Sequence, residues 1–250
     1  MLVVAAFVLA YGWPTIAAVQ VLLTGRVDVD LPDWIEHYLL GGNVMFLVAA
    51  AAMLLAHRWL GYTAGELGFG ARPCHPFPLS GLGAAAVAYL AMWIGFQVML
   101  WFPSPTGHQF PDVSLVDRVV GDARAALVEE SLLLALPVAV MTRLRWTWPA
   151  QLAVLIALRL PFHVYYGYGA IALALIWVSG YLFVYRRTQL VWPFMLAHFL
   201  YNAASGDYVP PFLRFLMGLV FTTTGVVLVI RLGRHRRTHQ SVPKSTREVP

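Results

Sequence analysis

Charged residues are scarce in this 250-residue chain: Asp, Glu, Lys and Arg together make up 12% of it, about half the share that is typical of soluble domains. Hydrophobic residues make up 60%, and the mean hydropathy is +0.69. Runs of roughly 17–25 apolar residues recur along the whole length, and a helix of that length crosses a bilayer. The composition therefore predicts an all-α fold, a polytopic transmembrane helical bundle, and argues against a soluble domain.

Cysteine is almost absent, since Cys74 is the only one. The chain can therefore form neither an internal disulfide nor a cysteine-based metal cluster. Lysine is also rare, with Lys244 alone among seventeen basic residues. An alanine- and arginine-rich chain of this kind is typical of a GC-rich bacterium, so a bacterial origin is expected.

The apolar runs predict about eight spans, with boundaries good to a few residues. These spans are 2–24, 38–57, 79–103, 122–144, 149–166, 169–186, 190–206 and 211–232. We divide the chain into N-terminal transmembrane helices (1–60), a core (61–206), a last transmembrane helix (207–232) and a basic, disordered cytoplasmic tail (233–250).

The basic residues indicate the orientation of these spans. Twelve of the seventeen lie in the tail or in the loops on one side, and three lie in the opposite loops. By the positive-inside rule, both termini are then cytoplasmic, as an even number of spans requires. We expect a multi-pass plasma-membrane protein in contact with membrane lipids. The net charge of +5 comes from basic residues in short loops and in the tail, where they orient the spans in the membrane. We therefore expect no nucleic-acid partner.

The most informative residues are two adjacent acids, Glu129 and Glu130, inside the predicted span 122–144. A carboxylate within a bilayer is costly unless something offsets it, so it is a functional hypothesis by default. His163 and His198 are the only histidines inside predicted spans, since His57 falls at the end of one and the others lie in loops or in the tail. Counted from the span ends, Glu129 and both histidines lie at similar depths. These residues are therefore predicted to form one site.

Asn202 follows His198 by four positions, so both side chains project from one face of a helix. Such a set suits hydrolysis, because a glutamate can deprotonate water while histidine and asparagine stabilise an oxyanion. The structural alternative is that each histidine makes only a packing hydrogen bond and that Asn202 joins two helices. Two adjacent buried acids have no comparable structural explanation.

The arrangement Glu129-Glu130, then His163, then His198-x-x-x-Asn202 resembles the CPBP intramembrane proteases, which include CAAX-processing endopeptidases and bacterial abortive-infection proteins. The segment Glu66-Leu67-Gly68 also resembles a short element that precedes the family's core, so the resemblance covers about residues 60–206, and the CPBP-like core is 61–206. The family implies an intramembrane endopeptidase acting on a protein or peptide substrate at the membrane. Nothing in the sequence indicates whether the substrate is prenylated.

By this resemblance, Glu129 is the catalytic glutamate, His163 and His198 assist, and Asn202 stabilises the oxyanion. No cofactor is firmly implied. If the enzyme is metal-dependent, Glu129, His163 and His198 would hold zinc in an open three-ligand site, but we favour activation of water by the glutamate. The alternative function is a non-enzymatic immunity or scaffold protein that retains a degraded protease site.

Two positions depart from the family's motifs: Leu134 replaces an arginine, and Arg159 replaces a phenylalanine. Leu134 lies one turn from Glu130, and Arg159 lies one turn from His163 at comparable depth. We hypothesise that Arg159 supplies the missing cation and pairs with Glu130 as a supporting residue. The alternative is that Arg159 extends to the membrane surface or binds a carbonyl, and that the site has weakened.

Overall fold

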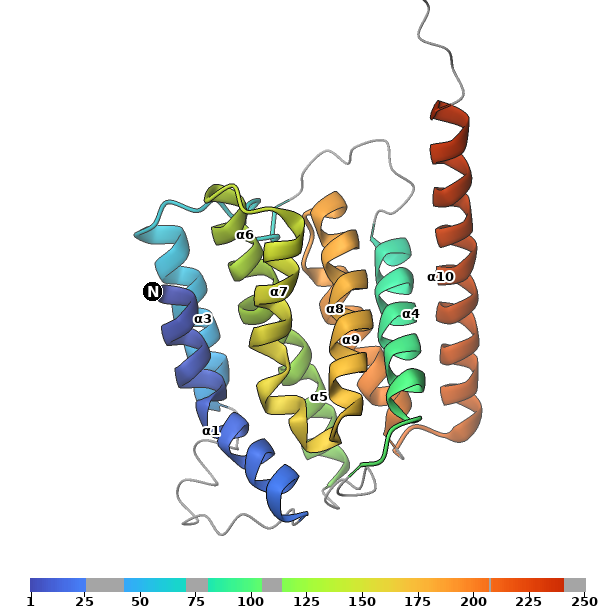
Figure 1. Cartoon of the computed structure of the whole chain (residues 1–250), viewed down its shortest axis with the longest axis horizontal. Coiled ribbons are helices and arrows are strands. Elements are labelled where there is room, and N and C mark those ends of the chain that lie inside the picture. The colour runs from blue at the N-terminus through green and yellow to red at the C-terminus, as the bar shows by residue number, and fades with distance from the viewer. Residues whose placement is uncertain (26–42, 71–80, 105–113, 207, 241–250) are drawn as a thin grey trace, which may run out of the picture.

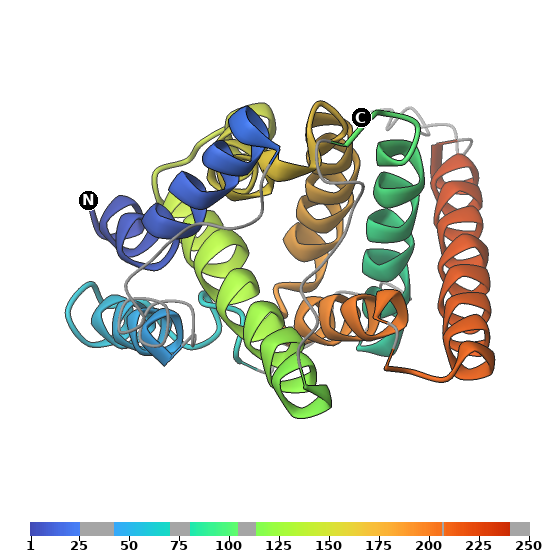
Figure 2. The same ribbon diagram turned by 90° about the horizontal axis from the view of Figure 1, so that it is seen from below.

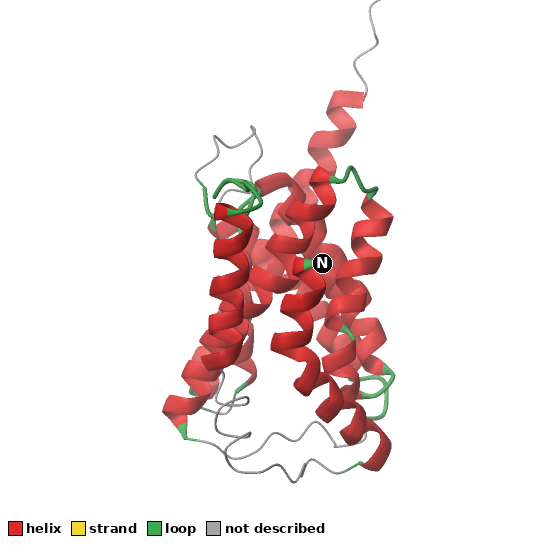
Figure 3. Cartoon of the chain, turned by 90° about the vertical axis from the view of Figure 1, so that its left-hand side faces the viewer, coloured by secondary structure: helices red, strands yellow, loops and turns green. Residues whose placement is uncertain are grey.

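The computed structural model describes residues 1–25, 43–70, 81–104, 114–206 and 208–240, the side chains of 43 and 233–240 excepted, and these residues form an all-helical bundle (Figures 1 and 3). Cys74 and the predicted span starts at 38 and 79 lie outside the described residues. The helices are α1 (Leu2–Thr24), α3 (Asn43–Arg58), α4 (Leu82–Met99), α5 (Leu115–Glu130), η2 (Ser131–Ala135), α6 (Leu136–Arg143), α7 (Trp148–Arg159), η3 (Pro161–Tyr166), α8 (Gly169–Thr188), α9 (Trp192–Ser205) and α10 (Pro211–Gln240).

The predicted helical bundle is confirmed, and each of the eight predicted spans contains helix. Length and composition allow five of the described helices to cross a membrane. These are α1, α4, the α5–η2–α6 rod, α8 and the part of α10 up to Leu232. By the same measure α3, α7 and α9 are too short, so helix length supports fewer full crossings than the eight that were predicted.

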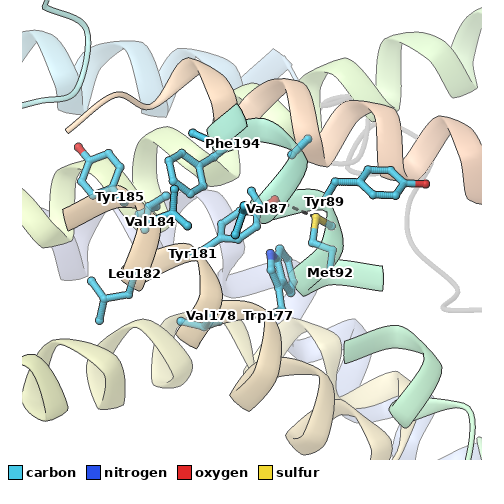
Figure 4. Packing of buried hydrophobic residues seen from close by; sticks show 14 of the residues in the cluster. Val87, Tyr89, Met92, Trp177, Val178, Tyr181, Leu182, Val184, Tyr185 and Phe194 are labelled. Atoms are coloured by element: carbon cyan, nitrogen blue, oxygen red, sulfur yellow. Dashed lines mark hydrogen bonds between the residues drawn. The ribbon is translucent and has the colours of Figure 1, made fainter. Parts of the chain in front are cut away.

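The helices are arranged as an up-and-down bundle with α1 and α3 at one edge and α10 at the other (Figures 1 and 2). Between them, α4 packs against α8, α9 and α10, while α5 packs against α9. The helix α1 packs against α3 and η3. Aromatic side chains from α4, α8 and α9 fill the centre of the bundle (Figure 4).

Three helix boundaries differ from the prediction. The helix α5 begins earlier, at Leu115, because Ser114 caps it by accepting a hydrogen bond from the Asp117 backbone N–H at 3.2 Å. The predicted span 149–166 is broken at Pro161, which lacks a backbone N–H and cannot continue an α-helix; η3 follows it. The helix α10 continues to Gln240, whereas the tail was predicted from 233. Residues 241–250 lie outside the described residues.

The Glu66-Leu67-Gly68 segment joins the α3–α4 connection to two later helices. Arg143, the last residue of α6, donates to Glu66 Oε1 and Oε2 at 3.1 Å each and to the carbonyl oxygens of Leu60 and Gly61. Gly68 accepts a hydrogen bond from the Val191 backbone N–H at the start of α9, at 3.0 Å. We call this set of contacts the Glu66–Arg143 clasp.

Candidate active site

Glu130 lies at the C-terminal end of α5 and is completely buried. Its Oε2 accepts a hydrogen bond from Arg159 Nη2 at 2.7 Å, and its Oε1 lies 2.8 Å from His198 Nδ1. A carboxylate paired with Arg159 only accepts, so His198 Nδ1–H is the donor. Both carboxylate oxygens are therefore satisfied, one by a residue of α7 and the other by a residue of α9.

The predicted pairing of Arg159 with Glu130 is present. Arg159 is 1% exposed, so the alternative in which it extends to the membrane surface is wrong. Leu134, which replaces the family's arginine, is buried in η2 among apolar side chains. A cation from another helix, α7, thus pairs with Glu130.

Glu129 is held less firmly than its neighbour. Its Oε2 lies 3.5 Å from Arg159 Nη1, a contact too long for a good hydrogen bond. Among the described residues, neither Glu129 Oε2 nor Arg159 Nη1 has a hydrogen-bond partner, although both atoms are buried. A buried polar atom without a partner is costly, and such atoms are often found where a ligand or a reacting group binds.

The break after α7 positions His163. Its backbone N–H donates to the Leu160 carbonyl at 3.0 Å. The Arg159 carbonyl, which would accept that N–H in a continuous α-helix, lies instead 2.9 Å from His163 Nδ1. A carbonyl oxygen only accepts, so Nδ1 carries the proton. In the neutral imidazole, Nε2 is then an acceptor, and it takes no part in the hydrogen bond to the Arg159 carbonyl that holds the ring.

Asn202 lies one turn beyond His198 on α9 and is half-buried. Within the described part of the chain, its side chain makes no hydrogen bond. The structure thus joins Glu129, Glu130, Arg159 and His198 by direct contacts and links His163 to Arg159 through its carbonyl. Asn202 is brought to the same helix face as His198, but among the described residues its side chain has no hydrogen bond to the other candidates.

A π-helical turn, η2, follows the two glutamates immediately. The Leu136 backbone N–H donates to the Ser131 carbonyl, five residues earlier. Pro137 explains this turn, because its ring would clash with the carbonyl four residues earlier in a regular α-helix. Such bulges are frequent at functional sites. The sequence analysis missed this turn, although Pro137 within the apolar run was a usable signal.

Trp177 on α8 was also missed. Its indole ring lies against Arg159, with the guanidinium carbon 4.4 Å from the ring centroid, and it contacts both candidate histidines edge to face. One of nine tryptophans in an apolar chain has no distinguishing sequence pattern. Trp177 could therefore be found only from the structure.

The described residues include no group of three or more His, Cys, Asp or Glu side chains placed to hold a metal ion. The Nδ1 atoms of His163 and His198 are both occupied by protein oxygens. Of the four ring nitrogens, only the two Nε2 atoms are left to serve, with Glu129, as ligands for the zinc site considered from the sequence.

Comparison with known proteins supports the motif assignment. Residues 115–204 match the model of the family described as "Type II CAAX prenyl endopeptidase Rce1-like". Comparisons with curated proteins and with solved structures found no match. The matched segment contains all six candidate residues. The resemblance predicted from the motifs is thereby confirmed: over residues 115–204 the chain is similar in sequence to the Rce1-like family of type II CAAX prenyl endopeptidases.

Proposed function

We propose that the chain is an intramembrane endopeptidase in which Glu129 activates the water that attacks a peptide bond. The family match supports a CAAX-type endopeptidase of the membrane in general terms. The observation that carries the finer assignment is the contrast between the two acids. Glu130 is satisfied by Arg159 and His198, whereas Glu129 keeps a buried oxygen without a hydrogen-bond partner among the described residues.

In this mechanism, Glu129 takes a proton from water as the water oxygen bonds to the substrate carbonyl carbon. His163 assists through Nε2, which accepts a hydrogen bond and orients the water. As the tetrahedral intermediate collapses, the C–N bond breaks and Glu129 returns its proton to the leaving amine. A carboxylic acid and an amine are the products, and the glutamate is regenerated.

The oxyanion requires donors, which we assign to His198 and Asn202. His198 Nδ1–H donates to Glu130, so Nε2 donates to the oxyanion only if the ring carries both protons. Charge balance supports this state, since an imidazolium and the Arg159 guanidinium together neutralise the two glutamates. Asn202 would supply its side-chain N–H from one turn further along α9.

The alternative of a non-enzymatic immunity or scaffold protein was based on the departures at Leu134 and Arg159. The Arg159–Glu130 pair weighs against it, because the cation missing from the first motif is provided in another way. The substrate of the proposed reaction is a protein or peptide at the membrane. Whether it is prenylated is tested below.

We further propose that the end of the bundle carrying Arg58, Arg143, Arg145, Arg186 and Arg187 faces the cytoplasm of a bacterial cell. The helix ends that carry His163 and Asn202 then face the opposite side. Single cysteines introduced at Tyr168 and Gly206, in a Cys74→Ser background, would test this orientation. Labelling of these positions only from the cytoplasmic side would contradict it.

The function is tested with the full chain in nanodiscs, using membrane-anchored peptides with and without a prenylated cysteine. Cleavage by the wild type and its loss in Glu129→Gln, with unchanged thermal unfolding, are expected. Glu66→Gln is the control for loss of a glutamate elsewhere in the chain: it should cleave at the wild-type rate, although loss of its contacts with Arg143 lowers its thermal stability. Wild-type cleavage rates in Glu129→Gln would refute the general-base assignment. Absence of cleavage with every substrate would favour the non-enzymatic alternative.

A further inference from the structure

One indole ring joins the candidate residues of three separate elements. Trp177 on α8 is 3% exposed. The Arg159 guanidinium carbon, from α7, lies 4.4 Å from its ring centroid. The His163 ring of η3 and the His198 ring of α9 lie at 5.7 and 5.5 Å, with interplanar angles of 87° and 80°.

The contact with Arg159 limits how the guanidinium can turn. Its N–H groups lie in the plane of the group, where Nη1 and Nη2 point towards Glu129 and Glu130. The Trp177 indole lies nearer to the guanidinium carbon than the Tyr181 ring, at 4.4 against 5.7 Å, and a cation–π contact of this kind is strongest when both groups are desolvated. A guanidinium held over a ring and paired at its edge has little freedom to rotate. Because this guanidinium contacts both Glu129 and Glu130, holding it in place also restrains the distance between the two carboxylates.

The contacts of Trp177 with His163 and His198 limit the rotation of the two imidazole rings. Each imidazole is held at Nδ1 by one hydrogen bond, to the Arg159 carbonyl or to Glu130. One bond alone leaves a ring free to swing about that attachment. Edge-to-face packing on Trp177 adds a contact from α8 to both rings. The His163 ring also packs on Phe162 and Tyr166 of its own element, η3, so Trp177 is the contact that the two histidines share and that helps to direct both Nε2 atoms.

Tyr181 and Phe162 each reach one of the residues that Trp177 contacts, since Tyr181 lies 5.7 Å from the Arg159 guanidinium carbon and Phe162 lies 4.4 Å from the His163 ring. Phe194, in contrast, makes no ring contact with Arg159, His163 or His198 in the part of the chain that the structure describes. Phe194 on α9 is fully buried and packs on Tyr181 and Tyr185, with ring centroids 5.0 and 5.7 Å apart. Figure 4 shows Phe194 and Trp177 in the same cluster, on opposite sides of Tyr181. Phe194 is thus a packing residue of similar burial that serves as a control for Trp177.

We propose that Trp177 is a positioning residue of the active site, which holds Arg159, His163 and His198 in their working orientation. This inference rests on the proposed endopeptidase function. It assigns to α8 a direct part in the site, although none of the predicted site residues lies on that helix.

The first test is kinetic, with Trp177→Leu, Trp177→Phe and Phe194→Leu in nanodiscs. Misplacement of reacting groups by about 1 Å can cost roughly 10²-fold in rate, so Trp177→Leu should lower kcat by about that factor and leave KM unchanged. Trp177→Phe keeps an aromatic face and should recover most of the loss. Phe194→Leu should destabilise the fold and keep kcat. Equal kcat losses in Trp177→Leu and Phe194→Leu would overturn the proposal.

The second test does not depend on cleavage. Thermal unfolding of Trp177→Leu, Arg159→Gln and their double mutant forms a cycle that reports coupling between the two side chains. The double mutant should lose less in Tm than the sum of the single losses, whereas the cycle of Phe194→Leu with Arg159→Gln should be additive. An additive Trp177 cycle would overturn the proposal even if the enzyme is active. A coupled cycle in a protein that cleaves nothing would uphold the contact and refute only the proposed function.

Discussion

Arg159 Nη2 donates to Glu130 Oε2 at 2.7 Å, and both side chains are almost completely excluded from solvent. Arg159 comes from α7, whereas the family's first motif would provide its arginine at position 134, on the same rod as Glu130. If Arg159 takes the place of that arginine, as we propose, the residues at positions 134 and 159 should be energetically coupled through Glu130.

Arg159→Phe should leave Glu130 buried with only His198 as a partner. Removal of one member of a buried ion pair typically costs about 3–5 kcal/mol, so we expect poor folding or loss of activity. Addition of Leu134→Arg restores the family's pattern and should recover much of the loss. A double-mutant cycle on thermal unfolding and on kcat measures the coupling.

The matched control is Leu134→Gln in the Arg159→Phe background. Glutamine is a polar side chain that can donate a hydrogen bond but carries no charge. It should fail to rescue. Additive effects in the Leu134→Arg cycle would mean that Arg159 has a role other than pairing with Glu130.

The candidate site residues stand out in the sequence because polar groups are rare within predicted spans. Glu129, Glu130, His163 and His198 interrupt apolar runs in which a polar group is costly. Their helices could also be predicted, since the runs have the length of a span. Pairing of Arg159 with Glu130 followed from the complementary departures at two motif positions.

Other features depend on contacts that no short pattern contains. Trp177 meets the site only because α8 packs beside α7 and α9 in the bundle. The break at Pro161 and the π turn before Pro137 both follow from proline sterics. An apolar run the length of a span does not reveal them, because proline is itself apolar and does not interrupt the run.

The proposed oxyanion donors predict the effect of their removal. His198→Ala and Asn202→Ala should each lower kcat by roughly 10²–10³, the usual cost of losing one such donor. His198→Ala should also lower thermal stability, because Glu130 loses a partner, whereas Asn202→Ala should not. Steady-state kinetics and thermal unfolding of the same preparations check both expectations. Unchanged kcat in Asn202→Ala would remove it from the mechanism.

Chelation separates the glutamate mechanism from the zinc alternative. If Glu129 activates water without a metal, EDTA and phenanthroline should leave cleavage unchanged. The measurement is kcat before and after chelation, with zinc added back afterwards. Complete loss of activity that zinc restores would refute the metal-free mechanism and favour the ligand set Glu129, His163 and His198.

The Glu66–Arg143 clasp predicts a pH effect outside the membrane. Hydrogen bonds from Arg143 and from the Thr63 backbone lower the pKa of Glu66 from its ordinary value of 4.5 to about 2. A carboxylate whose pKa is lower in the folded state stabilises the fold above its ordinary pKa. This stabilisation is lost as the pH falls from about 4.5 towards 2.

Glu66→Gln should therefore unfold at a lower temperature than the wild type at pH 7, and the difference should shrink as the pH falls below 4.5. The clasp is partly exposed to solvent, so the effect should be modest and should weaken in high salt. Arg143→Gln removes the other partner and should cause a larger loss at pH 7, because Arg143 also binds the carbonyl oxygens of Leu60 and Gly61. A Tm difference between wild type and Glu66→Gln that stayed constant from pH 7 to pH 3 would show that the ion pair does not hold this segment.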